Sequence, residues 1–228
     1  MCGTIFKLDS SGNETVLYSF TGGPDGKSPA GRLVRDSAGN LYGTASAAGV
    51  ANCSGAGCGT VFELSSTGVF SVLYSFTGGA DGGVPMAGLV RDGKGNLYGT
   101  ASSGGNTSAG NCTDNGGCGV VFKVTKTGAE TPLYSFTGDP DGSTPVGDLV
   151  RDTAGNLYGT TQFGGIGFGT VFKVSSAGAH STLWTFQKGT DGALPLAGLV
   201  RDTAGNLYGT ASNGGNQFEQ GVVFKLTP

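Results

Sequence analysis

One string of residues recurs four times along this chain, and this repeat limits the possible fold more than any other feature. Each copy contains Leu-Val-Arg-Asp-x-x-Gly-Asn-Leu-Tyr-Gly-Thr. The Asn-Leu-Tyr-Gly-Thr cores begin at Asn40, Asn96, Asn156 and Asn206, at intervals of 56, 60 and 50 residues. A repeat of this length holds about four short strands, which is the size of a propeller blade rather than of one solenoid coil.

Four runs of strand-forming residues make up each copy. Examples are 88–91 and 97–100 for the first two strands, 60–64 for the third and 72–76 for the outer strand. Gly, Asn, Asp or Ser bounds each run, and no window has the periodicity of an amphipathic helix. We therefore predict an all-β propeller of four blades, each with four antiparallel strands. A single domain should span residues 1–228, with repeats at about 3–58, 59–118, 119–168 and 169–220 and a closing strand at 221–228.

The strand count does not divide evenly among four blades. The third strand occurs five times, since residues 3–8 and 221–226 both match it, whereas the other three strands occur four times. A ring could close by pairing the C-terminal strands with the outer strand at 16–20. One third strand is then surplus, and it could fray, lie outside the ring, or add to the open edge of a neighbouring molecule.

Composition restricts the partners and the location. Charged residues make up 13% of the chain and the net charge is −3, so nothing favours nucleic acid. No apolar run approaches the roughly 18 residues of a membrane span. No cleavable leader precedes the first repeat strand, as expected for a mature or partial chain.

Two cysteine pairs lie at the same place in the first two full repeats, directly before the third strand. They are Cys53 with Cys58, and Cys112 with Cys118. We expect two local disulfides that order loops at the surface, and hence an oxidising compartment. The alternative is one zinc site formed by all four thiolates, although their spacing is at or beyond the usual range. Cys2 is left over and could be free, intermolecular or anchoring.

Repeated charged and aromatic residues have structural explanations. The Asp that follows each repeated Arg heads an Asp-x-x-Gly-Asn turn, where its carboxylate can accept backbone N–H bonds. These residues are Asp36, Asp92, Asp152 and Asp202. We expect the preceding arginines to form salt bridges or to stack between blades, and the repeated Tyr and Phe to pack between blades. The arginines are Arg35, Arg91, Arg151 and Arg201.

A second set of aspartates lies in the loops that join one blade to the next. Their members are Asp25, Asp81, Asp141 and Asp191. In a propeller these loops share a face with the cysteine loops and lie near the central channel. Four convergent carboxylates suit a hard cation such as Ca²⁺, so we treat them as candidate ligand- or cation-binding residues. The alternative is that each Asp-Gly makes a turn, with the Asp bonded to its own backbone.

The residues offer little for catalysis, and we assign no catalytic residue. His180 is the only histidine and is expected in an exposed turn, on the face opposite the aspartate loops. No nucleophile elbow, phosphate loop or haem-attachment motif is present. Paired carboxylates could cleave glycosides, but no unique pair stands out.

The repeat also resembles a known family. The string Leu-Tyr-Ser-Phe-Thr-Gly-Gly-x-Asp-Gly-x-x-Pro-x-x-Gly-Leu-Val-Arg-Asp-x-x-Gly-Asn-Leu-Tyr-Gly-Thr is similar to the tandem repeat of GloVer-containing bacterial proteins, which are mostly secreted or surface-anchored. The first two strands also resemble those of NHL-type propeller blades. The resemblance covers essentially the whole chain and implies an extracellular β-propeller, with no catalytic residues to carry over.

Three functions remain open on these grounds. The first is a secreted, non-enzymatic module that binds a carbohydrate or another surface ligand. The second is a structural protein that assembles into homo-oligomers through exchange of terminal strands. The third is a polysaccharide hydrolase or lyase. We expect no cofactor other than Ca²⁺, and an extracellular or cell-surface location.

Overall fold

A computed structural model describes residues 2–50, 53, 55–107, 112, 116–216 and 218–227, and in these residues every regular element is a strand. The strands follow the predicted runs closely. Their bounds are β1 Thr4–Leu8, β2 Glu14–Ser19, β3 Lys27–Pro29, β4 Val34–Arg35, β5 Leu41–Ala47, β6 Thr60–Leu64, β7 Phe70–Ser75, β8 Val90–Arg91, β9 Leu97–Ala101, β10 Val120–Val124, β11 Glu130–Ser135, β12 Val150–Arg151, β13 Leu157–Thr161, β14 Thr170–Val174, β15 His180–Thr185, β16 Val200–Arg201, β17 Leu207–Ala211 and β18 Val222–Leu226.

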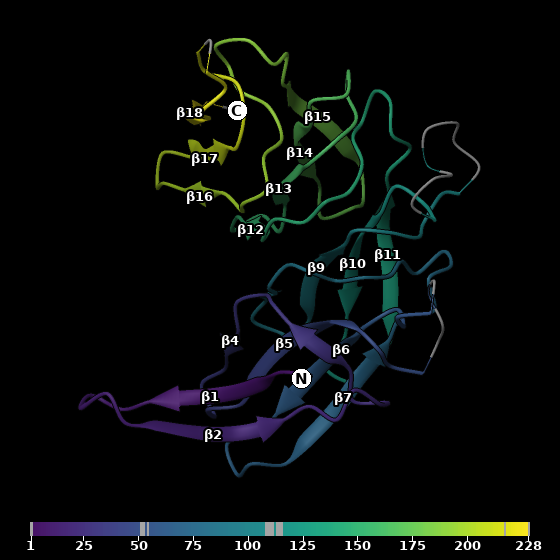
Figure 1. Ribbon diagram of the computed structural model, residues 1–228, viewed down its shortest axis with the longest axis vertical. Helices are drawn as coiled ribbons and strands as arrows, with labels where there is room; N and C mark the ends of the chain where they lie inside the picture. Colours follow the sequence, from purple (N-terminus) through teal and green to yellow (C-terminus); the bar gives the residue numbers. More distant parts are fainter. Residues whose placement is uncertain are drawn as a thin grey trace.

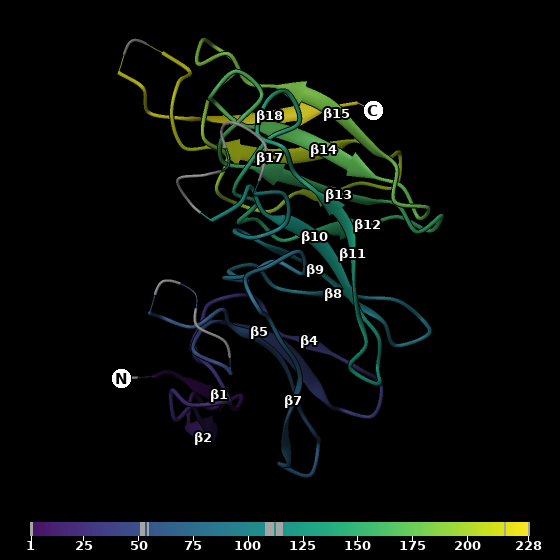
Figure 2. The ribbon, with the colours of Figure 1, turned by 90° about the vertical axis from the view of Figure 1, so that its right-hand side faces the viewer.

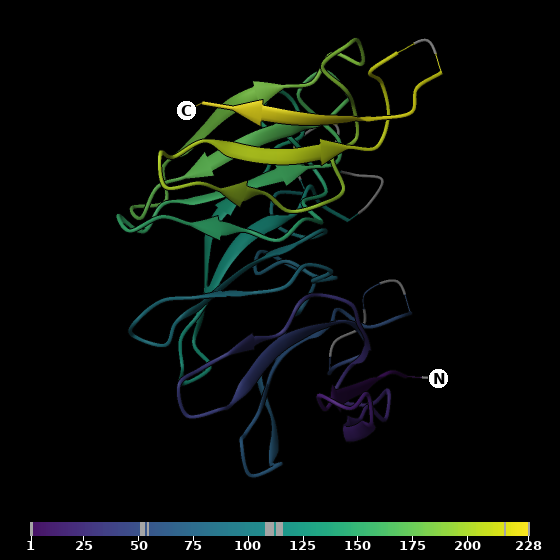
Figure 3. The same ribbon diagram turned by 90° about the vertical axis from the view of Figure 1, so that its left-hand side faces the viewer.

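The strands form a series of antiparallel sheets, each made from consecutive segments of chain. The three middle blades contain β4–β7, β8–β11 and β12–β15, and the short strand β3 also pairs with β5. At the two ends lie a two-stranded sheet, β1–β2, and a three-stranded sheet, β16–β18. The sheets follow one another along an open arc, with the first and last sheets at its opposite ends (Figures 1, 2 and 3).

The predicted all-β propeller with four-stranded antiparallel blades is confirmed. The two ends differ from the predicted closure, in which the outer strand near the N-terminus completes the last sheet. Instead β2 pairs with β1, and β18 pairs with β17. Among the described residues β18 therefore has one strand neighbour, and β1 is bound within its own sheet rather than free.

Aromatic rings of adjacent blades form the core between them. A phenylalanine just after each outer strand meets the phenylalanine of the third strand in the next blade: the centroids of Phe76 and Phe122 are 5.0 Å apart. Phe136 and Phe172 repeat this edge-to-face contact at the same distance. Such pairs add to the free energy of burying the rings themselves. The predicted packing of repeated aromatic residues between blades is confirmed.

A glycine before the third strand makes room for a proline in four of the five copies, at Gly3, Gly59, Gly119 and Gly169. Gly59 has φ +88°, and a Cβ built on it would lie 2.6 Å from Cδ of Pro85. The same contact recurs between Gly119 and Pro145. Only glycine combines this backbone conformation with so close an approach, which explains why both residues recur in the repeat. No helix in the described part of the chain is long and apolar enough to cross a membrane.

Candidate ligand-binding groove

Each aspartate in the loops between blades is bonded inside its own loop. Asp81 accepts hydrogen bonds from Tyr74 Oη at 2.8 Å and from the backbone N–H of Thr77 at 2.7 Å. Its other oxygen accepts the Thr77 hydroxyl. Both carboxylate oxygens thus fix the loop to the end of the outer strand, which is the turn role that the sequence offered as an alternative.

The other three loops repeat this arrangement with small changes. Asp25 is bonded to Tyr18 and Thr21, Asp141 to Tyr134 and Thr137, and Asp191 to Trp184 Nε1 at 3.2 Å. Burial would raise the pKa of Asp25, but the hydrogen bonds from Thr21 and Tyr18 outweigh it and lower the pKa. No group of three His, Cys, Asp or Glu side chains gathers among the described residues. A Ca²⁺ site at these four aspartates stays a prediction.

Both predicted disulfides are formed. Cys53 pairs with Cys58 and Cys112 pairs with Cys118, with Cα–Cα distances of 4.9 and 4.8 Å. The zinc alternative, which needs all four thiolates together, is therefore not what the structure shows. Cys2 is a free, partly buried thiol.

The disulfides lie deeper than a surface role requires. Cys58 packs in one core cluster with Phe76, and both Cys112 and Cys118 pack in the next cluster with Phe136. Gly78 has φ +78°, and a Cβ on it would lie 2.3 Å from Sγ of Cys53. The first disulfide therefore rests directly on the loop that leads to the next blade. The sequence predicted that the disulfides order surface loops and do not hold the fold together. In the structure Cys58, Cys112 and Cys118 also pack in the hydrophobic core.

A groove of about 410 Å³ lies where the two stapled loops face each other across one inter-blade loop. Residues of the first stapled loop, including Ala56, form one wall, and Ser103 contributes to the other. Thr77 and Val84 of the loop between the blades form the remaining lining. Val84 has a left-handed backbone (φ 56°), which is strained for a β-branched residue. The lining consists of small side chains, mostly apolar with a few hydroxyl groups, and the Cys53–Cys58 disulfide fixes it on one side.

The Asp-x-x-Gly-Asn turns have the structural role that the sequence predicts. Asp92 accepts the backbone N–H groups of Lys94 and Asn96, both at 2.9 Å, and the Tyr98 hydroxyl at 3.0 Å. Burial acts to raise the pKa of Asp92, but the bonds from Asn96, Tyr98 and Lys94 prevail and lower it to about 2. This carboxylate is therefore held ionised as part of the turn.

Three of the four repeated arginines stack on tyrosines between blades, which is one of the two roles predicted for them. The guanidinium carbon of Arg91 lies 5.7 Å from the ring centroid of Tyr42 in the preceding blade. Arg151 over Tyr98 repeats this contact at 5.6 Å, and Arg201 repeats it over a tyrosine one blade further on. These are cation–π geometries.

The prediction for His180 is wrong. This residue begins strand β15 rather than a turn, and its ring stacks on Tyr134 with centroids 4.3 Å apart. Burial lowers the pKa of His180, and the negative charge of Asp141 partly opposes that shift. Glycine and alanine before His180 suggested that the turn includes the histidine. In the structure the turn between β14 and β15 is shorter and ends before His180.

Glu130 was not identified as a candidate residue from its sequence position. It occupies the same repeat position as His180, at the start of strand β11, and its Oε1 is buried without a hydrogen-bond partner. Burial, and then the nearby charge of Asp81, raise the pKa of Glu130 from 4.5 to about 7. Its only sequence signal is a glutamate where the equivalent residue in the first middle blade is Phe70.

Solved structures with a similar fold cover most of this chain. A gluconolactonase from Xanthomonas campestris aligns over 99% of this chain and 69% of its own, with a TM-score of 0.56 and 13% identity. A second protein described as a gluconolactonase aligns over 99% and 71%, with a TM-score of 0.53 and 13% identity. At this identity the likeness establishes the propeller fold alone.

Sequence comparison identifies the family. No curated protein matches the chain significantly. The model of the Gloeobacter/Verrucomicrobia repeat matches residues 1–113 and again residues 111–228, which together cover the whole chain. The protein belongs to the Gloeobacter/Verrucomicrobia repeat family.

Proposed function

We propose that this protein is an extracellular, non-enzymatic binding module that holds a polar surface ligand, such as a glycan, in the groove between its two stapled loops. The observation that carries the proposal is the groove itself. It is large enough for a sugar unit, it is lined by small and hydroxyl-bearing side chains, and a disulfide forms part of its wall. Such a preformed, concave and partly polar surface is the common form of a small-ligand site.

The location follows from the chemistry of the walls. Disulfides form and persist in oxidising compartments, so the two disulfides support a location outside the reducing cytoplasm. Disulfides that hold a loop before the ligand arrives reduce the entropy lost on binding. Only the loops of two blades carry such staples, and these two loops face the groove.

A panel of soluble oligosaccharides, with binding measured by calorimetry, tests the proposal directly. Ala56 is exposed at the groove, so Ala56→Trp should fill it and abolish binding without loss of stability. Ile166 is an exposed residue of the corresponding unstapled loop, and Ile166→Trp is the matched control. Binding that survives Ala56→Trp, or the absence of binding at millimolar glycan, would remove the sugar proposal.

The same samples test the catalytic alternative. Turnover of a polysaccharide that is lost in Asp81→Asn, while Asp25→Asn retains it, would identify a hydrolase or lyase instead. Because Asp81 is bonded to Tyr74 and Thr77, the melting temperature of each variant must be measured alongside activity. We expect no turnover in any of the three proteins.

A further inference from the structure

The outer strand of each middle blade fills a recurring groove on the blade before it. Its first residue packs against an aromatic ring there: Phe70 stacks on Tyr18 with centroids 3.8 Å apart, and His180 stacks on Tyr134 at 4.3 Å. Glu130 takes the same place in β11, where its charge raises the pKa of Tyr74 after the larger effects of burial and of Asp81. The stacking contact therefore occurs twice within one chain, and Glu130 holds the equivalent position in the blade between them.

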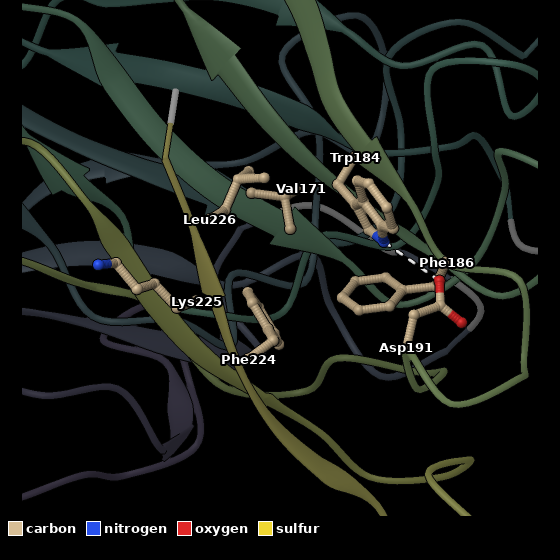
Figure 4. Close-up of a pocket in the computed structure, with 7 residues that line it drawn as sticks. All are labelled: Val171, Trp184, Phe186, Asp191, Phe224, Lys225 and Leu226. Atoms are coloured by element: carbon tan, nitrogen blue, oxygen red, sulfur yellow. Dashed lines mark hydrogen bonds between the residues drawn. The ribbon is translucent and has the colours of Figure 1, made fainter.

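At the C-terminal end this groove is empty. Within the described residues the last sheet comprises β16–β18, and no outer strand pairs with β18. A pocket of about 160 Å³ lies there, between Trp184 of the preceding blade and Phe224 and Leu226 of β18 (Figure 4). Trp184 occupies the repeat position of Tyr134, yet it is 42% exposed because no strand covers it. The pocket and the open edge of β18 are thus a site for one more outer strand.

At the other end the third strand is only partly used. Strand β1 exposes Phe6 by 53% and Leu8 by 58%, whereas their counterparts Phe122 and Val124 in β10 are fully buried. Strands β1 and β18 hold the same repeat position, and their sequences, Thr-Ile-Phe-Lys-Leu and Val-Val-Phe-Lys-Leu, share the last three residues. Either strand therefore has the side chains needed to lie beside β2.

We propose that β18 of one molecule displaces β1 of a second molecule and pairs with its β2. Strands β16–β18 of the first molecule and β2 of the second then make one complete four-stranded blade. By the β1–β2 register, Leu226 would lie opposite Glu14 and Lys225 opposite Thr15. Glu14 would enter the pocket at Trp184, as His180 does at Tyr134.

The exchange is favourable for a physical reason. Five residues of β18 replace five residues of β1, so the ladder hydrogen bonds lost and gained are about equal in number. Val223, which is 82% exposed in the single molecule, takes the buried place that Ile5 of the displaced strand leaves, so these two residues offset each other. The new blade also covers the apolar pocket at Trp184, which has no such counterpart loss. The burial of this apolar surface drives the association. Two different surfaces meet, so the contact is head-to-tail.

Engineered disulfides test the register between molecules. In a Cys2→Ser background, one variant carries Lys225→Cys and the other Thr15→Cys. Mixing the two should give a cross-linked pair, whereas Ser11→Cys in the exposed β1–β2 turn should give none with Lys225→Cys. Equal cross-linking of both partners would overturn the proposal. So would a protein carrying both substitutions that cross-links only within one chain, since the strand would then close its own ring.

Sedimentation across a wide concentration range gives a second test, in which a deletion is expected to strengthen the association and not to weaken it. Deletion of residues 1–8 removes the strand that competes with β18, so association should strengthen at least tenfold. Val223→Glu should abolish this association without changing the stability of the single molecule, since the residue is exposed there but covered in the pair. Val69→Glu, at an exposed turn, is the matched control. Unchanged or weakened association after the deletion would contradict the proposal.

Discussion

The third strand of a middle blade and the third strand at the N-terminal end have the same pattern of residues around a shared Phe-Lys, but very different surroundings. In β10, Phe122 and Val124 are fully buried between blades. In β1, Phe6 and Leu8 are more than half exposed, although β1 pairs with its neighbour in the same register and with the same bulge. The repeat thus determines that a strand forms and how it pairs. Whether another blade packs on that strand determines how much the strand contributes to the free energy of unfolding.

The largest expected difference lies between two substitutions at the same repeat position. Phe122→Ala should lower the free energy of unfolding by about 3–5 kcal/mol, because it leaves a cavity between blades. Phe6→Ala should lower it by less than about 1 kcal/mol, since half of the ring is already in water. Urea denaturation measures both. Equal losses would show that β1 is covered in solution.

The two disulfides offer the next comparison. Both sulfurs of Cys112–Cys118 are buried, whereas Cys53 of the other pair is only partly buried. Replacing Cys112 and Cys118 together by Ala should cost about 2 kcal/mol from the freed loop, plus the lost packing. The same change at Cys53 and Cys58 should cost less. Thermal melts of both variants, with reduced wild type as reference, measure the difference, and the reverse order would refute it.

A smaller effect is expected on the pH dependence of stability, to which the buried Glu130 contributes. The folded-state pKa of Glu130, about 7, lies above its ordinary value of 4.5, so the protein is stabilised when this group is protonated. That stability is complete below pH 4.5 and is lost as the pH rises to 7. Glu130→Gln should remove about 1 kcal/mol of this pH dependence after allowance for solvent screening. Urea denaturation at a series of pH values measures this change, and a profile that Glu130→Gln leaves unaltered would contradict the prediction.

The smallest effect concerns backbone strain in the groove. Val84 has a left-handed backbone, whereas Val72 lies in an extended strand. Val84→Gly should raise the free energy of unfolding by about 0.5 kcal/mol, because glycine adopts positive φ without steric cost. Val72→Gly should instead lower it by about 1 kcal/mol, since the strand loses a β-branched residue. A loss at both positions would mean that side-chain packing at Val84 outweighs the strain.

The strands were the most predictable part of this protein. The third-strand prediction for 60–64 matches β6, and the outer-strand prediction for 72–76 is shifted by two residues at the start of β7 and one at its end. Such strands can be predicted because runs of β-branched and aromatic residues are separated by glycine-rich turns. The two disulfides and the aspartate turns could also be predicted, since each joins residues that lie within about six positions of one another in the sequence.

The site was less predictable, because its parts come from three separate loops. The cysteines placed the stapled loops on the sequence, but nothing in the sequence showed that they face each other across Thr77 and Val84. The surroundings of His180 were missed for a similar reason: its ring stacks on Tyr134 of another blade, about 45 residues earlier in the sequence. Contacts between blades leave no local signal.

The sequence by itself determined the blade, because strand pairing within a blade and the bonding of Asp81 and Asp92 in their turns are contacts between near neighbours in the chain. The tertiary structure alone decided which surfaces stay open. Phe6, Trp184 and Val223 occupy the same repeat positions as more buried aromatic or aliphatic residues elsewhere in the chain. They are exposed because no described blade packs against them. Burial is a property of what packs on a residue, and a repeat sequence does not state where its packing ends.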